Sequence, residues 1–373
     1  MPRPEFSLAT HLERIVEVGR LRFPVTTLKI LNANDPKNIE TAALILRAGG
    51  LVAFPTETVY GLGADALNEK AVLRIFEAKK RPSFDPLIVH VVSPEQAYPL
   101  WSEVPDVAKK LMKKFWPGPL TLVLPKSDVV PDVVTSGLPT VAVRMPKNDA
   151  ALALIRALGK PIAAPSANIF GYTSPTSAAH VMEDVGEKID LVLDGGECPV
   201  GVESTVLRIE KGGAVVLRPG GVSVEEIRKI ISVKRIESEA GTPESPGQLA
   251  SHYAPWTPLV LMPQPFSKGS ADLEKCIELC RSKKQNACRP GYLAFRKKPE
   301  LPWLESGVVL SAKGDLHEAA ANLFQAIRKL DKMHLDLILA EPVPEEGLGS
   351  AIMDRLRKAS GGKNATAQFF ENF

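Results

Sequence analysis

The chain has 373 residues, of which 45% are hydrophobic and 24% are charged. This mixture is typical of a soluble globular protein and excludes disordered, collagen-like and disulfide-scaffold classes. The 46 Lys and Arg residues nearly balance the 43 Asp and Glu residues, and the resulting net charge of +3 does not require a nucleic-acid partner. At about 150 residues per domain, the length predicts two to three domains.

The four cysteines, at positions 198, 276, 280 and 288, include no CxxC pair and stand near no paired histidines. We therefore expect them to pack as small apolar residues and expect no structural zinc site. No apolar run approaches the ~18 residues that a membrane span needs, and the first residues lack the apolar core of a signal peptide. These observations predict a cytoplasmic protein with no membrane partner.

Residues 1–27 are interpreted as an N-terminal extension to which we assign no chemistry. Residues 28–233 then alternate between short apolar strands and amphipathic helices. The strands are expected at 51–54, 87–92, 120–124, 141–145, 161–164, 191–193, 206–209 and 214–217. The helices are expected at 39–47, 68–79, 106–115, 150–158 and 224–231. Because hairpin and crossover spacings both occur, we predict a mixed, twisted α/β sheet with flanking helices.

Residues 234–258 lack a helical or strand period and are rich in Pro and Gly, which predicts a linker. This segment also carries His252 and Tyr253, which a plain spacer does not need. It is either packed down by its aromatic residues or closes as a lid, with Gly241 and Gly247 as hinges. Strand–helix alternation resumes over residues 259–373 and predicts a smaller, Rossmann-like and mostly parallel α/β domain.

Polar clusters follow the apolar strands of the first domain, where α/β sheets usually bind ligands. The segment from Thr56 to Thr58 is either a well-capped turn or a contact to a small polar ligand. The cations Lys79 and Arg81 complement a helix C-terminus, and they also suit a polyphosphate. P-loop ATPases are excluded because no GxxxxGK[ST] motif occurs.

Two further clusters extend this pattern. Arg144 stands inside an apolar strand, so we expect it to pair with a carboxylate from the protein or from a substrate. Ser166 and Asn168 offer donors to phosphate oxygens, and Ser174-Pro175 is expected to open a helix whose free backbone donors take an anion. Together the four clusters indicate a pocket for an anionic nucleotide and a small carboxylate.

The motifs in these clusters resemble those of the YrdC-like threonylcarbamoyl-AMP synthases, in their longer, two-domain branch. The resemblance covers about residues 36–373. It rests on PTETVYGL at 55–62, KxRP at 79–82, WPGP at 116–119, VR at 143–144, PSAN at 165–168, STV at 204–206, LRPG at 217–220, and SPG at 245–247 followed by HYAP at 252–255. It implies an enzyme that condenses L-threonine, bicarbonate or CO2, and ATP into threonylcarbamoyl-AMP and pyrophosphate. The product feeds the machinery that threonylcarbamoylates adenosine in tRNA, and tRNA binding by the enzyme itself is not required.

The resemblance also implies site residues. The family's signature set around the phosphates and the carbamate corresponds to Lys79, Arg81, Ser166 and Asn168. The L-threonine contacts correspond to Thr56, His90, Arg144, Ala164 and Ser204. The ATP contacts correspond to Lys79, Ser83, Thr140, Ser166, Ser174, Arg218 and Tyr253. No residue is assigned as a metal ligand, because the Mg2+ that ATP chemistry implies is expected to be held mainly by phosphates and water.

Two other functions are compatible with parts of the sequence. A non-catalytic RNA-binding module would use the same basic cavity and bind tRNA in a salt-dependent manner. The balanced charge and the 6% aromatic content disfavour it. A carbamoyl-transfer enzyme of the same fold, from hydrogenase maturation, would carry zinc fingers, which the cysteine spacing excludes. The role of the second domain stays open between regulation, lid support and partner docking.

Overall fold

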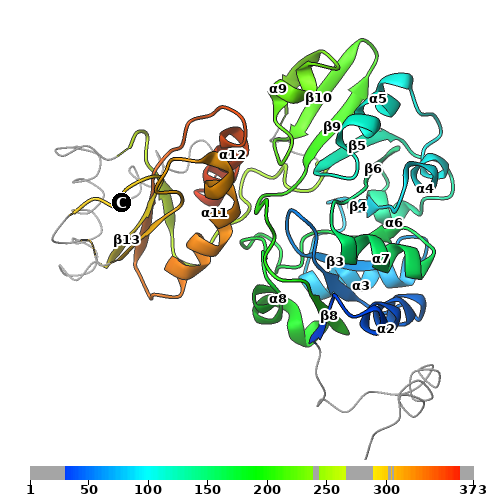
Figure 1. Cartoon of the computed structure of the whole chain (residues 1–373), viewed down its shortest axis with the longest axis horizontal. Helices are drawn as coiled ribbons and strands as arrows, with labels where there is room; N and C mark the ends of the chain where they lie inside the picture. The colour runs from blue at the N-terminus through cyan, green and yellow to red at the C-terminus, as the bar shows by residue number, and fades with distance from the viewer. Residues whose placement is uncertain (1–29, 238–242, 266–288, 301–303, 305, 362–373) are drawn as a thin grey trace, which may run out of the picture.

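The computed structural model describes residues 30–237, 243–265, 289–300, 304 and 306–361. The predicted N-terminal extension and the proposed hinge residue Gly241 lie outside these residues. The described chain forms two α/β units that pack side by side, a larger N-terminal domain and a smaller C-terminal domain (Figure 1). No helix in these ranges combines the length and the apolar character that a membrane crossing requires.

The N-terminal domain is built on a mixed sheet, as the hairpin and crossover spacings predict. Its eleven strands in the described residues have the order β1-β8-β2-β3-β7-β4-β6-β5-β9-β10-β11, with parallel and antiparallel neighbours. Their bounds are β1 (Ile30–Asn32), β2 (Val52–Phe54), β3 (Gly61–Asp65), β4 (Ile88–His90), β5 (Leu120–Pro125), β6 (Thr140–Arg144), β7 (Ile162–Ala163), β8 (Leu191–Asp194), β9 (Thr205–Glu210), β10 (Gly213–Arg218) and β11 (Val233–Ile236). Strand β11 pairs with β10 and runs three residues past the predicted domain end at 233.

Helices cover both faces of this sheet. They are α2 (Pro36–Arg47), α3 (Glu69–Lys79), α4 (Pro94–Ala97), α5 (Asp106–Phe115), α6 (Asp132–Thr135), α7 (Asp149–Leu158), α8 (Ala178–Val185) and α9 (Val224–Arg228), with short 3-10 turns at Tyr98–Leu100 and Gly186–Lys188. The two faces are separate cores, as β2 illustrates. Ala53 packs into the cluster that contains Ile75 of α3, whereas Phe54 packs with Leu46 of α2 and Leu154 of α7. This alternation follows from the two-residue period of a strand.

The prediction that a helix begins at Ser174-Pro175 is wrong. Helix α8 begins at Ala178, and the hydroxyl of Ser177 caps it by accepting the backbone N–H of His180. Residues 174 and 175 are held elsewhere, because the Pro175 carbonyl accepts the Tyr60 backbone N–H and the Ser174 hydroxyl is bonded to a side chain. The segment is therefore pinned to the sheet rather than free to start a helix.

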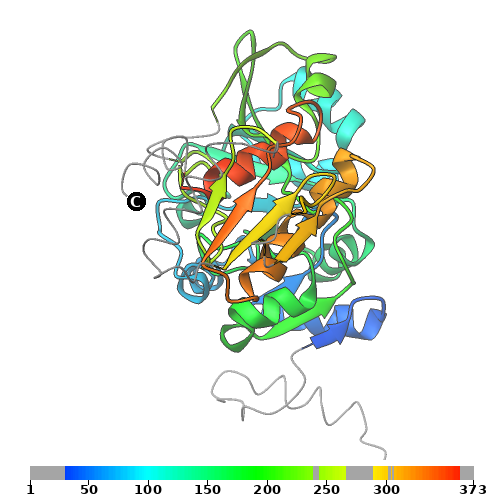
Figure 2. The same cartoon turned by 90° about the vertical axis from the view of Figure 1, so that its left-hand side faces the viewer.

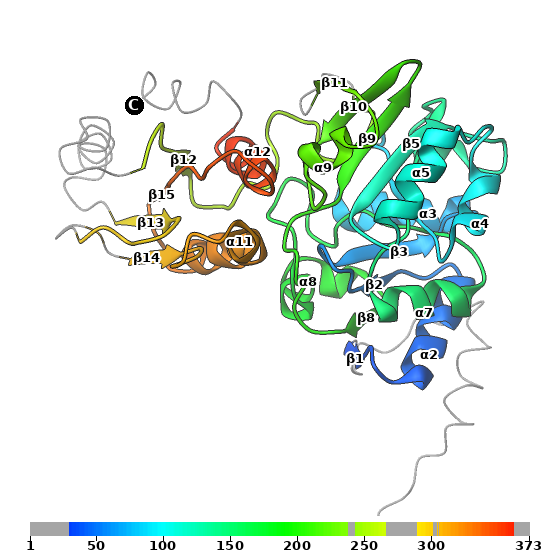
Figure 3. The same ribbon diagram turned by 45° about the horizontal axis from the view of Figure 1, so that its top comes forward.

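The C-terminal domain contains a parallel four-stranded sheet in the described ranges, as predicted, with the order β12-β15-β13-β14 (Figure 2). Its elements are β12 (Leu259–Leu261), β13 (Pro290–Ala294), β14 (Ser306–Val309), α11 (Leu316–Asp331), β15 (Leu337–Ala340) and α12 (Gly349–Ala359). Helices α11 and α12 lie between this sheet and the N-terminal domain (Figure 3). Side chains of both helices therefore reach the larger domain.

Candidate active site

A pocket of about 510 Å3, its solvent-open part included, lies where the parallel strands β4 and β6 end beside each other. Nine of the sequence-predicted site residues line it: Thr56, Arg81, His90, Arg144, Ala164, Ser166, Ser204, Arg218 and Tyr253. The fold thus brings together side chains that are up to about 200 positions apart in the chain. This location agrees with the general placement of ligand sites at strand ends in α/β sheets.

The polar loop after β2 is a capped turn and also a wall of the pocket. The Thr56 hydroxyl accepts the backbone N–H groups of Thr58 and Val59, each at 3.2 Å, and donates to the Val59 carbonyl at 2.6 Å. The hydroxyl oxygens of Thr56 and Thr58 are 2.9 Å apart, and both residues face the pocket. The two alternatives from the sequence, a turn and a ligand contact, are therefore compatible.

Arg144, the last residue of β6, has the carboxylate partner that the sequence predicts. Its Nη2 lies 2.7 Å from Oε2 of Glu57, and its Nη1 donates to the Thr58 hydroxyl at 2.9 Å. Its Nε donates to the Gly118 carbonyl at 3.3 Å. The carboxylate partner of Arg144 is therefore a residue of the protein, Glu57. The other edge of the guanidinium faces the neutral hydroxyl of Thr58.

Lys79 stands directly behind the pocket wall. It ends α3, where the left-handed Lys80 (φ 53°) reverses the chain. The Lys79 ammonium donates to the carbonyls of Ser166, at 2.6 Å, and Asn168, and the Ser166 hydroxyl donates to Oδ1 of Asn168 at 2.5 Å. Burial lowers the pKa of Lys79 well below its ordinary value, and the neighbouring Arg81 lowers it further. Three of the four signature residues therefore form one hydrogen-bonded unit.

Arg81, the fourth signature residue, lines the pocket and is held by the loop that follows it. Its Nη2 lies 2.9 Å from a carboxylate oxygen of Asp85 and donates to the Pro86 carbonyl at 2.9 Å. Its guanidinium also lies 5.7 Å from the ring centre of Phe170. Burial raises the pKa of Asp85, and Arg81 opposes that rise. The pair fixes Arg81 but also offsets much of its charge.

His90, the last residue of β4, is a neutral wall of the pocket. Burial, aided by Arg144, lowers the pKa of His90 to about 3. Its ring meets Phe54 edge-on with 6.0 Å between the ring centres. At neutral pH the side chain is therefore an uncharged part of the pocket wall, and its Nδ1 lies 3.2 Å from the Ile88 carbonyl oxygen.

Arg218, at the end of β10, differs from the other two pocket arginines. Its Nε and Nη2 donate to the carbonyl and hydroxyl of Ser204, both at 3.2 Å, and its Nη1 donates to the Pro246 carbonyl at 3.1 Å. The Ser204 hydroxyl is also 2.7 Å from that of Thr121. Within the described part of the chain, no carboxylate lies within ion-pair distance of Arg218. Its charge is therefore available to an anion.

The linker closes one side of the pocket. Gly247 adopts φ +83°, and a Cβ there would lie 2.5 Å from the Tyr253 hydroxyl and 3.2 Å from Cδ of Arg218. The rings of His252 and Tyr253 are 4.2 Å apart, and Lys358 of α12 donates to the Gly247 carbonyl at 2.6 Å. These contacts support a linker that is packed onto the site, and they involve the C-terminal domain.

Five predicted residues do not line the pocket. Lys79 and Asn168 act through Ser166, and the Ser174 hydroxyl donates to the Glu203 carboxylate. Two others lie apart from it. Ser83 is solvent-exposed on the loop after α3, and Thr140 begins β6, at the strand end opposite Arg144.

Several residues that line the pocket were not among the predicted site residues, although Thr58 was placed in a candidate ligand-binding turn and Gly247 at a hinge of the linker. These are Thr58, Val59, Gly61, Ile88, Pro165, Glu203, Pro246, Gly247 and His252. Most are neighbours of predicted residues, so the motifs pointed to them. Glu203 differs from these residues because it places a negatively charged carboxylate in a pocket whose other charged side chains attract anions. Its position directly before Ser204 was the available signal.

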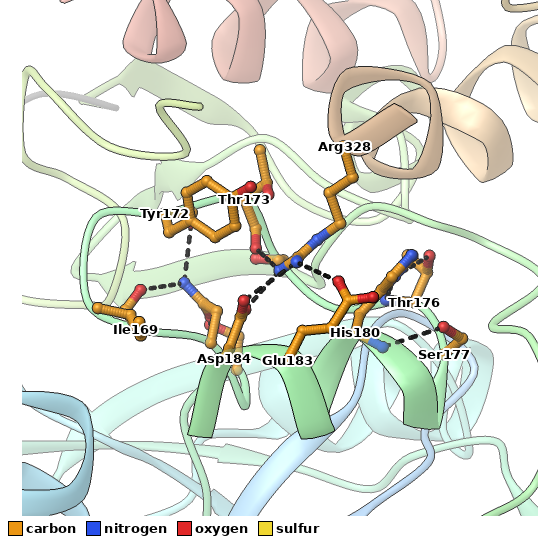
Figure 4. A network of polar contacts seen from close by, with 12 residues as sticks. Ile169, Tyr172, Thr173, Thr176, Ser177, His180, Glu183, Asp184 and Arg328 are labelled. Carbon is orange, nitrogen blue, oxygen red and sulfur yellow. Dashed lines mark hydrogen bonds and ion pairs between the residues drawn. The ribbon is translucent and has the colours of Figure 1, made fainter. Parts of the chain in front are cut away.

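Beside the pocket, the two domains are joined by a buried polar network (Figure 4). Arg328 of α11 donates to the Thr173 carbonyl at 2.6 Å and to Oδ1 of Asp184 on α8 at 3.1 Å. Its guanidinium lies 4.7 Å from the ring centre of Tyr172, whose hydroxyl donates to Asp331 at 2.7 Å. The network fastens α11 to the segment that follows Asn168.

Comparisons with known proteins agree with this architecture. Residues 44–220 match a family model described as "Telomere recombination", and residues 222–361 match one described as "Threonylcarbamoyl-AMP synthase, C-terminal domain". The chain is 49% identical to the threonylcarbamoyl-AMP synthase of Pyrococcus abyssi, over 87% of this chain and 94% of that protein. It is 45% identical to the threonylcarbamoyl-AMP synthase of Bacillus subtilis, over 89% of this chain and 95% of that one.

A solved structure of P. abyssi Sua5 complexed with L-threonine matches with a TM-score of 0.82 and 48% identity. The match covers 90% of this chain and 98% of that one. Both domains, their order and their fold are therefore shared across nearly the whole length of the relatives. This chain belongs to the threonylcarbamoyl-AMP synthase family.

Proposed function

We propose that this chain makes threonylcarbamoyl-AMP from L-threonine, bicarbonate or CO2, and ATP in the pocket described above. The threonine amine adds to CO2 and loses a proton, which gives a carbamate. A carbamate oxygen attacks the α-phosphorus of ATP, and the bond from that phosphorus to pyrophosphate breaks. Since the reactants supply the nucleophile and the leaving group, the protein has to position them and stabilise charge.

The distribution of charge in the pocket is the observation that carries this proposal. Arg81 and Arg144 each face a carboxylate of the protein, whereas Arg218 and Lys79 have no carboxylate within ion-pair distance among the described residues. Arg218 thus brings an unpaired positive charge to the pocket, which suits a nucleotide whose leaving group gains negative charge, while Lys79 lies behind the wall and holds Ser166. A site for a neutral ligand would not need this charge.

The threonine end of the site is assigned to the wall around Arg144. The edge of the Arg144 guanidinium that contacts the Thr58 hydroxyl suits the carboxylate of an amino acid, and Thr56 and Ser204 bring hydroxyl groups to the pocket. Ala164 and the uncharged His90 leave room for a small side chain without a competing charge. The P. abyssi structure named above is a complex with L-threonine, which supports this substrate.

The nucleotide end is assigned to Arg218 and the linker residues Gly247 and Tyr253. Ser83, Thr140 and Ser174, which do not line the pocket, stay predicted ATP contacts. Among the described residues, no group of three or more His, Cys, Asp or Glu side chains is arranged to hold a metal ion. We assign Mg2+ to the nucleotide, as part of the substrate, because phosphate oxygens and water are ligands that it prefers, and there it would neutralise the phosphates. A cytoplasmic location and transfer of the product to a tRNA-modifying enzyme also stay proposals.

The proposal is tested by mixing the purified chain with ATP, Mg2+, L-threonine and labelled bicarbonate. Pyrophosphate release that requires both threonine and bicarbonate, with label in an adenylate, is the expected result. Release without threonine would contradict it. Failure to bind either ATP or threonine would overturn it in favour of the RNA-binding alternative.

A further inference from the structure

Among the side chains of the C-terminal domain that reach the pocket wall, Arg355 of α12 contacts an acidic residue of the pocket. Arg355 is fully buried, and its Nε lies 2.9 Å from Oε2 of Glu203. Its Nη1 donates to the Pro219 carbonyl at 2.6 Å and lies 2.9 Å from Asp354. Glu203 lines the pocket, so the contact joins the second domain to the site itself.

Glu203 is an unusual residue for an anion-binding pocket. The pocket's other buried acidic partners, Glu57 and Asp85, are each paired with an arginine of the same domain. Within the described ranges, the ion-pair partner of Glu203 comes from the other domain. Its second oxygen accepts the Ser174 hydroxyl, which fixes the carboxylate between the two domains.

We propose that Arg355 is a positioning residue of the adenylation site: it neutralises Glu203 and holds that carboxylate on Ser174, so that the pocket accepts the phosphates of ATP. The inference rests on the proposed function. It assigns the C-terminal domain a direct electrostatic part in substrate binding, beyond its packing against the N-terminal domain.

The charges around Glu203 support this role. Burial alone would raise the pKa of Glu203, but the guanidinium groups of Arg355 and Arg218 outweigh it and bring the pKa down to about 2. On α12, Asp354 is itself paired with Arg355 and Lys358. From the linker, burial lowers the pKa of His252 and raises that of Tyr253, so both are neutral near pH 7. Without Arg355, Glu203 would face the pocket with Arg218 as its nearest cation, and Arg218 would lose free charge for the nucleotide.

The test compares ATP binding by Arg355→Met with that of the wild type, by titration calorimetry and by KM in the pyrophosphate assay. We expect the ATP dissociation constant to rise roughly tenfold to a hundredfold, because one unbalanced buried charge faces the phosphates. The double variant Arg355→Met/Glu203→Gln, which removes both charges of this pair, is expected to bind ATP within about threefold of the wild type. Arg355→Lys keeps the charge but cannot contact Glu203, Pro219 and Asp354 together, so its ATP binding should lie between those of Arg355→Met and the wild type. If Arg355→Met does not fold, weaker binding by Arg355→Lys that Glu203→Gln does not restore overturns the proposal.

Arg328→Met is the matched control, since it removes a buried arginine of α11 whose partner Asp184 does not line the pocket. It should lower the melting temperature and change ATP binding less than threefold. Equal weakening by both variants, or no rescue by Glu203→Gln, would show that docking alone matters and overturn the proposal. The difference in ATP binding between Arg355→Met and the wild type should narrow as the pH is lowered, because loss of Arg355 raises the pKa of Glu203 and protonation of its carboxylate removes the repulsion. An inactive wild type would instead contradict the proposed function.

Discussion

Arg144 and Glu57 join two walls of the pocket through a buried ion pair of 2.7 Å. Arg144 comes from the end of β6 and Glu57 from the loop after β2, and each is about 5% exposed or less. The pair holds one edge of the guanidinium, while the other edge contacts the Thr58 hydroxyl at 2.9 Å. A substrate carboxylate can take the place of that hydroxyl without breaking the ion pair.

Replacing Arg144 by Lys is therefore expected to weaken threonine binding selectively. A lysine cannot bridge Glu57 and a second carboxylate, so we expect a loss of about 2–3 kcal/mol, or roughly a 30- to 150-fold rise in KM for threonine. ATP binding should change less than threefold. Steady-state kinetics of pyrophosphate release, with each substrate varied in turn, measure both. Arg156→Lys, at an exposed position on α7, is the control, and an equal loss for ATP would contradict the assignment.

Lys79 is expected to be essential although it does not line the pocket. Lys79→Met leaves the carbonyls of Ser166 and Asn168 without their shared donor, which costs about 1–3 kcal/mol per buried group. We expect kcat to fall roughly 100-fold or more because both residues shift. The adjacent, exposed Lys80 provides the matched variant Lys80→Met, which keeps the turn and should retain activity. Loss of activity in both variants would mean that the turn, and not the ammonium group, is required.

Much of the fold could be predicted because its strands are short apolar runs bounded by turns. Strand β3 (Gly61–Asp65) could not, because two glycines and a terminal aspartate give it little intrinsic strand preference. It is held by its pairing with β2 and by the bond from the Leu62 backbone N–H to the Pro165 carbonyl. Strand β11 falls within the predicted linker for a similar reason, since its pattern is largely exposed.

The site likewise contains residues that the sequence predicts and residues that it does not. The sequence predicts that Arg144 needs a carboxylate, because a buried charge demands a partner, but it does not identify Glu57. The only local signal for Glu203 is its position directly before Ser204, and its partner Arg355 lies 152 residues further along the chain. Contacts between domains leave no periodic pattern in a single sequence. They become visible when the helices of the second domain are placed against the first.

The buried His90 predicts a loss of stability in acid. Its pKa is about 3 in the folded protein, lowered by burial and then by Arg144, against about 6.5 in the unfolded chain. As the pH falls below about 6.5 the unfolded state binds a proton that the folded state does not, so the free energy of unfolding falls by about 1.4 kcal/mol per pH unit. Urea unfolding of the wild type and His90→Gln at pH 7.5 and pH 5 measures this.

The substitution His90→Gln removes one such proton. Between pH 7.5 and pH 5 it should therefore lose about 2 kcal/mol less stability than the wild type. The difference at pH 7.5, where histidine is neutral in both states, gives the cost of the substitution itself. Parallel pH dependence in the two proteins would contradict the assignment of a neutral, buried His90.

Gly247 tests whether the linker acts as a lid. Both Gly247 (φ +83°) and Gly212 (φ +78°) have left-handed backbones, so alanine strains each by about 1 kcal/mol. A Cβ at Gly212 meets nothing within 4 Å, whereas one at Gly247 would lie 2.5 Å from the Tyr253 hydroxyl and 3.2 Å from Cδ of Arg218, so these side chains would have to move. We expect Gly247→Ala to weaken ATP binding tenfold or more in titration calorimetry and Gly212→Ala to leave it unchanged. If both variants bind ATP equally well, the packing of Tyr253 against Gly247 does not close the pocket, and the linker only connects the two domains.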